Sequence, residues 1–292
     1  MPRCCHLDFE TYSEADLKKV GAYRYANDPS TEILCAAMAL DDEEPVAWMH
    51  PSFKEPFLNT AMRTAVLEKY WDALEDPEVL IWCHNAMFEM AICQSLLWKT
   101  WGIRCPALSR FRCTMSLARR ASLPSKLEKL AEVLGLTQQK DTCGKSLIRK
   151  FSVMQTARKP TKKHPDGVAP YRILPSDAPE LFAEFVEYCR QDVRVEQAVH
   201  RKLSYFSDPI NDANYSLDAV INARGVTVNL PALRHAQKLI EEETEIVSAE
   251  FRALTGFEVT QNARLLEWLH SEGVHLDNLQ AETIETFLEE HP

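Results

Sequence analysis

Near its start the chain reads Cys4-Cys5-His6-Leu7-Asp8-Phe9-Glu10-Thr11. The apolar residues of this stretch predict a buried β-strand, and residues two apart on a strand share a face. Asp8 and Glu10 should therefore project side by side from the end of the strand. Two adjacent carboxylates repel each other unless a cation lies between them, and oxygen ligands suit Mg²⁺ or Mn²⁺. A strand end with two solvated acids would show the same pair, so other parts of the chain must distinguish the two interpretations.

Three more apolar runs predict strands. The runs 31–40 and 45–50 are separated by an acidic turn, and they predict a three-stranded meander with the first strand. The stretch between the first two strands, 12–28, is polar and irregular. The short run 79–83 is continuously apolar, as expected of a strand that is buried on both faces.

Helical apolar spacing recurs through the remainder of the chain, at 59–74, 86–98, 115–121, 126–134, 142–151, 176–206, 213–224, 230–255, 263–271 and 281–290. Strands come first, then a strand between helices, then helices alone. This order predicts an α/β fold, a mixed sheet flanked by helices, with an all-helical C-terminal appendage. Asp208-Pro209 looks like the boundary, so we expect one domain at 1–208 and a helical segment at 209–292.

Composition excludes several classes of protein. The chain has 46% hydrophobic residues, as soluble globular proteins do, and no apolar run is long enough to span a membrane. Nothing near Met1 resembles a signal peptide, so we expect a cytoplasmic protein. The nine cysteines form no C-x-x-C pair. We interpret them as reduced core thiols rather than a disulfide framework or a zinc site.

Charge is distributed unevenly along the chain. The net charge is −10, yet residues 110–163 hold 14 Lys/Arg against 3 Asp/Glu, and residues 209–292 hold 5 against 15. A basic segment inside an acidic protein indicates a polyanion that is bound at one place. The alternative is a solvated helical face that is basic by chance.

Two later stretches offer partners for the first acids. Asn85 and Glu89 follow the strand 79–83, and their spacing of four places them on one helix face near the strand end, where ligands of α/β sheets bind. The alternative is that Asn85 caps the helix and Glu89 favours its dipole. Tyr188 and Asp192 share a face of the helix 176–206 in the same way, although such a pair is often a contact at the edge of the core.

Four carboxylates on a strand and two helices can hold two divalent ions. Two such ions, about 3.5–4 Å apart, clamp the attacking and leaving oxygens of a phosphodiester cleavage. The hydroxyl of Tyr188 would orient the attacking water. It would not act as a base, since the pKa of tyrosine, about 10, is too high.

The order and spacing of these residues resemble a known pattern. Asp8-Phe9-Glu10, His84-Asn85-Ala86-Met87-Phe88-Glu89 and Tyr188-x-x-x-Asp192 resemble the three motifs of the DEDD 3′→5′ exonucleases in their tyrosine form. The chain also resembles bacteriophage family A DNA polymerases, in four stretches: Leu7–Ser13, Cys113-Thr114-Met115 with Leu123-Pro124, Tyr188–Val193, and Asn222–Asn229.

The resemblance implies a ribonuclease H-like exonuclease domain that removes mismatched nucleotides from single-stranded DNA 3′ ends, as the proofreading part of a phage replicative polymerase. The host cytoplasm would then be its location. Residues 209–292 would be the start of the polymerase region, around the thumb. The palm and fingers motifs are absent from these 292 residues, so polymerase activity is not expected of them. We expect either a truncated form or a natural fragment.

The resemblance also implies roles for single residues. Asp8, Glu10 and Asp192 would hold one Mg²⁺ or Mn²⁺ ion, Asp8 and Glu89 a second, and Tyr188 would orient water. The terminal nucleotide would contact a further set, namely the backbone near Thr11 together with Asn85 and Phe88. One position departs from the family, because its second motif commonly carries Asp where this chain has Glu89.

Two other functions compete with proofreading. An exonuclease fold that is catalytically weak or silent could serve the polymerase as a DNA-binding or structural module, and Glu89 favours this alternative. An enzyme that trims RNA 3′ ends would use the same fold, but the polymerase-like stretch 222–229 argues against it.

The basic segment generates a prediction about DNA binding. Neutralising Arg158, Lys159, Lys162 and Lys163, which lie in the expected loop 156–175, should weaken DNA binding and reduce its salt dependence, because fewer counterions are then released. Affinity measured over a series of salt concentrations checks this. An unchanged salt slope would mean that the loop is only a solvated linker.

Overall fold

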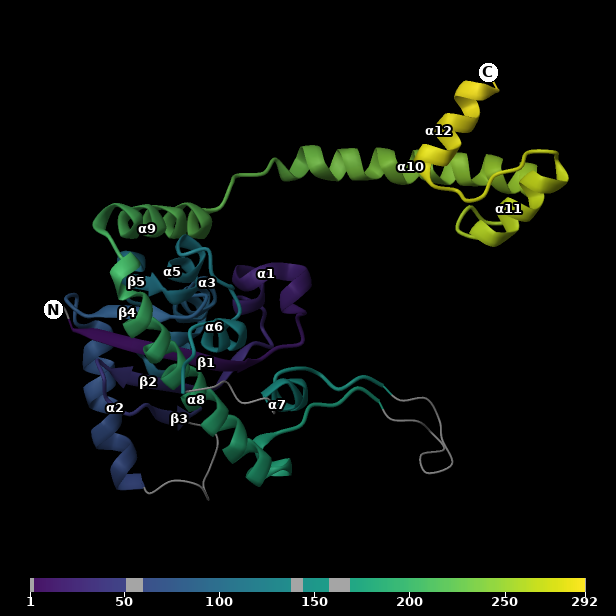
Figure 1. The fold of residues 1–292 in the computed structure, drawn as a ribbon. Coiled ribbons are helices and arrows are strands. Elements are labelled where there is room, and N and C mark those ends of the chain that lie inside the picture. The colour runs from purple at the N-terminus through teal and green to yellow at the C-terminus, as the bar shows by residue number, and fades with distance from the viewer. Residues whose placement is uncertain (1–2, 51–59, 138–143, 158–168, 292) are drawn as a thin grey trace. The chain divides into compact units, whose positions relative to one another are not determined.

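The computed structural model describes residues 3–50, 60–137, 144–157 and 169–291, and within 60–67 it describes the backbone only. Figure 1 shows a sheet covered by helices and a separate helical region at the C-terminal end. The expected fold class, a mixed sheet flanked by helices with a helical C-terminal region, is confirmed.

The sheet has five strands in the order β3-β2-β1-β4-β5. Their bounds are β1 Cys4–Tyr12, β2 Glu32–Leu40, β3 Val46–Met49, β4 Leu80–Cys83 and β5 Phe111–Cys113. The first three form the expected antiparallel meander, and β4 and β5 add to β1 in parallel. The central strand β1 pairs with β4 only as far as His6↔Trp82, so its second half extends beyond the carboxyl end of β4.

The remainder of the described chain consists of helices and of the turns and loops that join them. The longer ones are α1 Leu17–Ala26, α2 Thr60–Glu75, α5 Thr114–Arg120, α6 Leu127–Val133, α7 Gly144–Phe151, α8 Pro179–Leu203, α9 Pro209–Arg224, α10 Leu230–Thr255, α11 Asn262–Ser271 and α12 Ala281–Glu290. The segment after β4 is one continuous run of helix, α3 Met87–Ile92, the π-helical turn η1 Cys93–Leu97 and α4 Trp98–Trp101. Single 3₁₀ turns complete the set, η2 Leu108–Arg110, η3 Pro175–Asp177 and η4 Ser204–Phe206.

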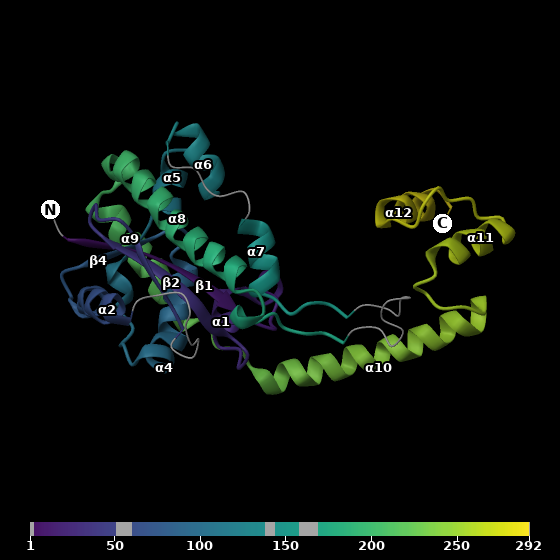
Figure 2. The ribbon, with the colours of Figure 1, turned by 90° about the horizontal axis from the view of Figure 1, so that it is seen from below.

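The two faces of β1 differ in chemistry because its side chains alternate. Cys5, Leu7 and Phe9 are buried in the main core, together with apolar residues of α1, α2, α3 and α9. The opposite face carries His6, Asp8 and Glu10, and α8 covers it. Figure 2 shows α8 running across the sheet with α6 and α7 beside it.

The polar face of β1 meets α8 in a regular register. Two residues of a strand advance about 6.6–6.8 Å, and four residues of a helix advance about 6 Å. Alternate residues of β1 therefore meet every fourth residue of α8, which runs in the opposite direction. Three pairs define this β1–α8 stripe: Cys4 with His200, His6 with Glu196, and Asp8 with Asp192.

Two helices differ from the sequence-based expectations. The irregular stretch 12–28 contains α1, which is interrupted at Gly21 by non-helical backbone with φ of 76°. Asp208-Pro209 begins a helix: the carboxylate of Asp208 accepts hydrogen bonds from the backbone of Ile210 and Asn211, and Pro209 is the first helical residue. α9 packs on β5 and η2, where Arg112 and Arg120 bridge to Asp212.

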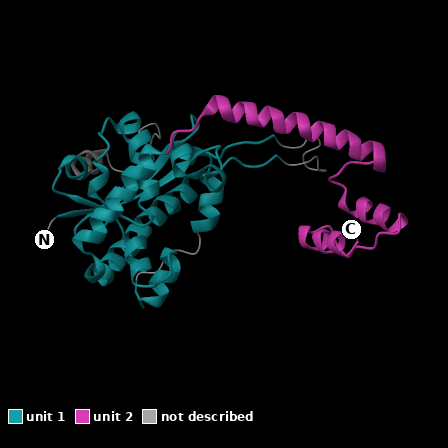
Figure 3. Cartoon of the chain, turned by 90° about the horizontal axis from the view of Figure 1, so that it is seen from above, with its two compact units in different colours: residues 1–225 teal, residues 226–292 magenta. Residues whose placement is uncertain are grey.

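The chain forms two compact units, Met1–Gly225 and Val226–Pro292 (Figure 3). The division falls one helix later than the expected boundary at 208, because α9 packs on the first unit. The expected domain boundary at residue 208 stays a prediction, because compact units and domains are not the same division. The second unit contains α10, α11 and α12, and Asn229 caps α10 by accepting from the backbone of Ala232.

The eight cysteines among the described residues are all reduced, and six of them are buried. Cys4 and Cys105 are partly exposed. Among the described helices there is none with the length and apolar character needed to cross a bilayer. A cytoplasmic location stays a prediction.

The β1–α8 stripe contains a buried ion pair whose loss should be costly. His6 and Glu196 have side chains only 3% and 4% exposed. Burial lowers the pKa of His6, but attraction to Glu196 and hydrogen bonds with Cys4 and Glu196 outweigh this and raise it to about 10. We expect Glu196→Ala to destabilise the fold by about 3–5 kcal/mol, since it leaves a buried charge without its partner. Urea unfolding measures this.

Asp42→Ala is the matched control, because it removes an ion pair with Arg201 whose side chains are 78% and 51% exposed. We expect it to lower the free energy of unfolding by less than about 1 kcal/mol. Equal effects of the two substitutions would contradict the importance of the buried pair.

Candidate functional site

Three carboxylates converge where β1 extends beyond β4. Oxygen atoms of Asp8, Glu10 and Asp192 all lie within 4.8 Å of one another. Glu10 and Asp192 are buried, and Asp8 is partly exposed. The two-residue spacing on β1 places the first two acids on one face, and the β1–α8 stripe supplies the third. The structure thus joins the predicted residues of the first and third motifs.

Small side chains on β2 let α8 approach this part of the sheet. Cys35, Ala37 and Ala39 are fully buried against Cys189 and Val193 of α8. A helix can lie close to a sheet only where the intervening side chains are small, because protein interiors are densely packed. The alanines of β2 therefore help to bring Asp192 within reach of Asp8.

Cys189 contacts the acids directly. Its Sγ lies 3.4 Å from Oδ2 of Asp8 and 3.6 Å from the Asp8 carbonyl oxygen. Burial, followed by hydrogen bonding to Cys35 and the nearby acids, raises the pKa of Cys189 well above its usual value. The group is therefore a thiol, which donates to Asp8 and orients it.

Glu89 lies in the first turn of α3, just after β4. Its side chain is buried, and its Oε2 atom has no hydrogen-bond partner within the described part of the chain. Burial, followed by repulsion from Asp8, raises the pKa of Glu89 well above its usual value. A buried carboxylate oxygen without a partner is costly, and it fits a site that holds a cation. The donor set as a whole consists of oxygens, as Mg²⁺ and Mn²⁺ prefer.

Tyr188 is buried beside the acids. Its ring stacks on Phe185 at 6.2 Å between centroids, with 8° between the planes. Its pKa is raised first by burial, then by the charges of Asp192, Glu10 and Asp8, and also by a hydrogen bond with Asp192. Tyr188 therefore keeps its proton and can only donate or accept hydrogen bonds. The expectation that it does not act as a base agrees with this environment.

Gly144 lies directly against the ring of Tyr188. A Cβ atom at Gly144 would lie 2.0 Å from Cε2 of Tyr188 and 2.6 Å from two further ring atoms. Only glycine fits between α7 and the ring, and the stacked ring of Phe185 limits the movement of the Tyr188 ring. The sequence contains no signal for this contact, because it depends on how α7 packs on α8.

The residues expected to contact a nucleotide are partly brought together. Thr11 follows an irregularity in the pairing of β1 with β2, and its hydroxyl hydrogen-bonds to that of Tyr25 at 2.8 Å. The ring of Tyr25 lies 5.9 Å from that of Phe88. Tyr25 therefore links Thr11 to Phe88 beside Glu10. Sequence reasoning missed it, because 12–28 shows no helical pattern.

The position of Asn85 differs from both sequence-based interpretations, a helix cap and a shared helix face with Glu89. It precedes α3 in a turn, is exposed, and has a left-handed backbone with φ of 72°. It is therefore neither the cap of α3 nor on one helix face with Glu89. Its carbonyl instead accepts a hydrogen bond from the backbone of Phe88 at 3.0 Å.

The basic segment is used in part for packing. Arg110 is buried and donates to the carbonyls of Ala73, Leu74 and Val79, at the end of α2 and just before β4. Arg112 and Arg120 hold α9, as described above. These three side chains are not part of a free basic surface. The residues predicted to attract DNA, Arg158, Lys159, Lys162 and Lys163, lie outside the described residues.

The mixed five-stranded sheet, covered by helices, thus carries a cluster of three carboxylates where its central strand extends beyond β4. Over 97% of its length the chain is homologous to the DNA polymerase of Bacillus phage SP02, with 34% identity over 287 residues. The chain spans 41% of the length of that polymerase. The resemblance to bacteriophage DNA polymerases seen in the motifs is thereby confirmed.

Solved structures of nucleases also show a likeness to this chain. The match to one of them, the apo form of the nuclease, includes 74% of this chain and 79% of the nuclease chain, with a TM-score of 0.34 and 14% sequence identity. The match to Brucella melitensis NrnC with bound Mg²⁺ includes 76% of this chain and 86% of the NrnC chain, with a TM-score of 0.39 and 12% sequence identity. No model of a protein family matches the chain.

The contact of Gly144 with Tyr188 generates a prediction. Gly144→Ala should destabilise the fold by about 1–3 kcal/mol, because the methyl group displaces a ring that is stacked on Phe185. In a Tyr188→Ala background the same change should have little effect, since the space is then open. Urea unfolding of the unmodified chain, the two single variants and the double variant gives the coupling energy between positions 144 and 188.

Lys145→Ala, at the next residue of α7, is the control, because the Lys145 side chain is 88% exposed. We expect it to leave stability nearly unchanged. A Gly144→Ala effect that persists without the Tyr188 ring would show that the contact is not its cause.

Proposed function

We propose that this chain is a metal-dependent exonuclease that removes nucleotides from DNA 3′ ends, with single-stranded and mismatched ends as substrates. The observation that carries this proposal is the convergence of Asp8, Glu10 and Asp192, with Glu89 buried nearby and its Oε2 without a partner among the described residues. A purely structural domain gains nothing from buried acids that repel one another.

The acids supply the ligands for two divalent ions. Asp8, Glu10 and Asp192 would hold one ion, and Asp8 with Glu89 the other. When bound, the ions offset the charge of the acids and of the phosphodiester and make water a better nucleophile. Burial and the charge of Asp8 raise the pKa of Glu89, so metal binding would be coupled to deprotonation of this carboxyl.

The other residues position the reacting groups. Tyr188 keeps its proton and hydrogen-bonds to Asp192, so it orients water instead of deprotonating it. Cys189 donates to Asp8 and fixes the direction of that carboxylate. The backbone at Thr11, next to Glu10, and the partly exposed Phe88, which Tyr25 links to Thr11, would contact the terminal sugar and base. Asn85 is exposed in the turn before α3, so its side chain is available to contact the DNA strand.

Homology to a phage DNA polymerase supports DNA as the substrate and proofreading as the role. An exonuclease that accompanies a polymerase encounters the primer 3′ end when a mismatch frays it. Because the chain spans 41% of that polymerase, the helices from 209 onward would belong to the beginning of the polymerase region.

A silent module is the second candidate function, and Glu89 supports it. Its carboxylate stands one methylene further from the backbone than that of the Asp common in this motif, and burial favours its neutral form. A domain with this defect would bind a DNA 3′ end without cleaving it.

Cleavage of a 5′-labelled oligonucleotide in the presence of Mn²⁺ tests the proposal. The protein should produce a descending ladder, and it should degrade DNA faster than RNA and mismatched 3′ ends faster than paired ones. Asp8→Asn and Glu89→Gln should each reduce the rate about 100-fold or more, because each removes charge that stabilises the transition state by several kcal/mol.

Glu187→Gln provides the control. Glu187 lies on the exposed side of α8, the helix that carries Asp192, and it pairs with Arg190 and Arg194. Its rate should match that of the unmodified chain. Equal cleavage by Asp8→Asn would contradict the assigned site. Binding of the 3′ end without cleavage by the unmodified chain would favour the silent module, and a preference for RNA would favour RNA trimming.

A further inference from the structure

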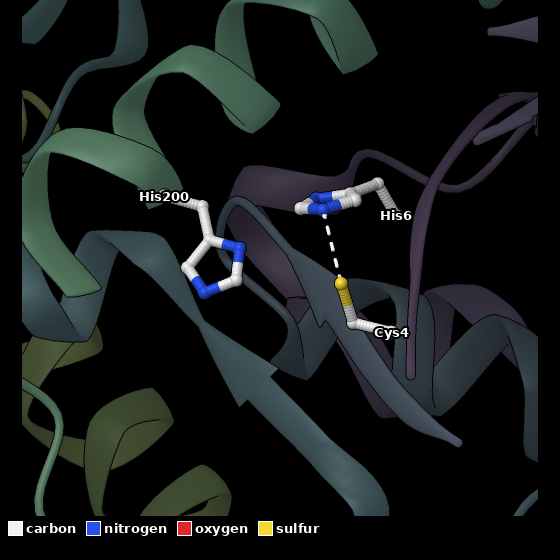
Figure 4. Close-up of side chains that lie close together, drawn as sticks. All are labelled: Cys4, His6 and His200. Atoms are coloured by element: carbon white, nitrogen blue, oxygen red, sulfur yellow. Dashed lines mark hydrogen bonds between the residues drawn. The ribbon is translucent and has the colours of Figure 1, made fainter. Parts of the chain in front are cut away.

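A second group of metal-binding side chains lies at the other end of the β1–α8 stripe. There the first residues of β1 face the last turn of α8, and a cavity of about 750 Å³ opens beside them. Cys4, His6 and His200 all line this cavity. Their potential ligand atoms, one sulfur and two imidazole nitrogens, lie within 4.8 Å of one another. Figure 4 shows the ring of His200 facing His6 and Cys4.

The spacing of two of these atoms matches a metal site. Cys4 Sγ and His6 Nε2 are 3.6 Å apart. Zinc binds thiolate sulfur at about 2.3 Å and imidazole nitrogen at about 2.0–2.1 Å, and at a tetrahedral angle these bonds place the two ligand atoms about 3.6 Å apart. The same separation also permits a weak hydrogen bond, so the remaining ligand and its surroundings decide the interpretation.

The two imidazoles are held in place by their neighbours. Nδ1 of His6 hydrogen-bonds to Glu196, which directs Nε2 toward Cys4. A carboxylate that binds the far nitrogen of a histidine is the usual support of a metal-ligating imidazole. The ring of His200 stacks on Trp82, with centroids 3.8 Å apart and 24° between the planes. The site is therefore largely formed before any ion arrives.

We propose that Cys4, His6 and His200 form a zinc site that joins the start of β1 to the end of α8, with the fourth coordination position open to the cavity. Thiolate and imidazole donors suit Zn²⁺, whereas the oxygen donors of the acidic cluster suit Mg²⁺ or Mn²⁺. One stripe thus offers two sites of different chemistry. Binding releases to solvent the proton of the Cys4 thiol and any proton on the His6 nitrogen that faces it.

Co²⁺ is the probe that separates this site from the acidic cluster, because only a thiolate ligand produces the intense near-ultraviolet charge-transfer band of a cobalt–sulfur bond. Titration of the metal-free chain should produce this band with one equivalent, and Zn²⁺ should abolish it. Cys4→Ser should eliminate the band, and His200→Gln should weaken Co²⁺ binding about tenfold or more. Both residues are partly exposed, so the variants should fold.

Two controls complete the experiment. Cys105→Ser removes the other partly exposed thiol among the described cysteines and should leave the band unchanged. Asp192→Asn alters the acidic cluster and should also leave it unchanged. In addition, Zn²⁺ should raise the melting temperature of the unmodified chain and of Asp192→Asn but not of Cys4→Ser. Absence of the band, or a band of equal intensity in Cys4→Ser, would overturn the proposal.

Discussion

The antiparallel packing of α8 across the polar face of β1 is the constraint on which the sheet and its sites depend. Two strand residues and four helix residues advance by nearly the same distance, about 6–7 Å, so the two elements stay in register over several steps. The small side chains of β2, such as Ala37, let the helix approach closely enough for the facing polar groups to touch. A shift of one residue in β1 would turn His6 and the acids into the apolar core.

The facing pairs of the β1–α8 stripe differ in how the charges of their polar groups are balanced. At one step His6 and Glu196 have opposite charges, and their attraction offsets the loss of hydration. At the next step two carboxylates, Asp8 and Asp192, face each other, and a bound cation would offset their mutual repulsion, as the proposed function requires. On that proposal, the stripe is structural in its middle and holds the reaction site at the end beyond β4.

Much of this arrangement could be predicted from spacing. Alternation on a strand places Asp8 beside Glu10, and an interval of four on a helix aligns Tyr188 with Asp192. What depends on packing between distant segments could not be predicted. Gly144 carries no local signal of the ring that it accommodates, and α1 lacks the apolar periodicity that identifies a helix. Asp208-Pro209 has two meanings in a sequence, a break or a helix start, and only the docking of α9 distinguishes them.

Glu89 shows most clearly what the fold adds to the sequence. As a motif residue it is only a glutamate in place of an aspartate, and its extra methylene argues against function. In the structure it lies in the first turn of α3, which follows β4, and burial together with the charge of Asp8 favours its neutral form. A neutral carboxyl would reduce the repulsion within the cluster, in which Glu10, Glu89 and Asp192 are buried and Asp8 is partly exposed. A divalent ion bound at the proposed site would reverse this balance, because it would stabilise the ionised form of Glu89. Burial of Glu89 beside Asp8 would thus couple the charge of the proposed site to metal binding.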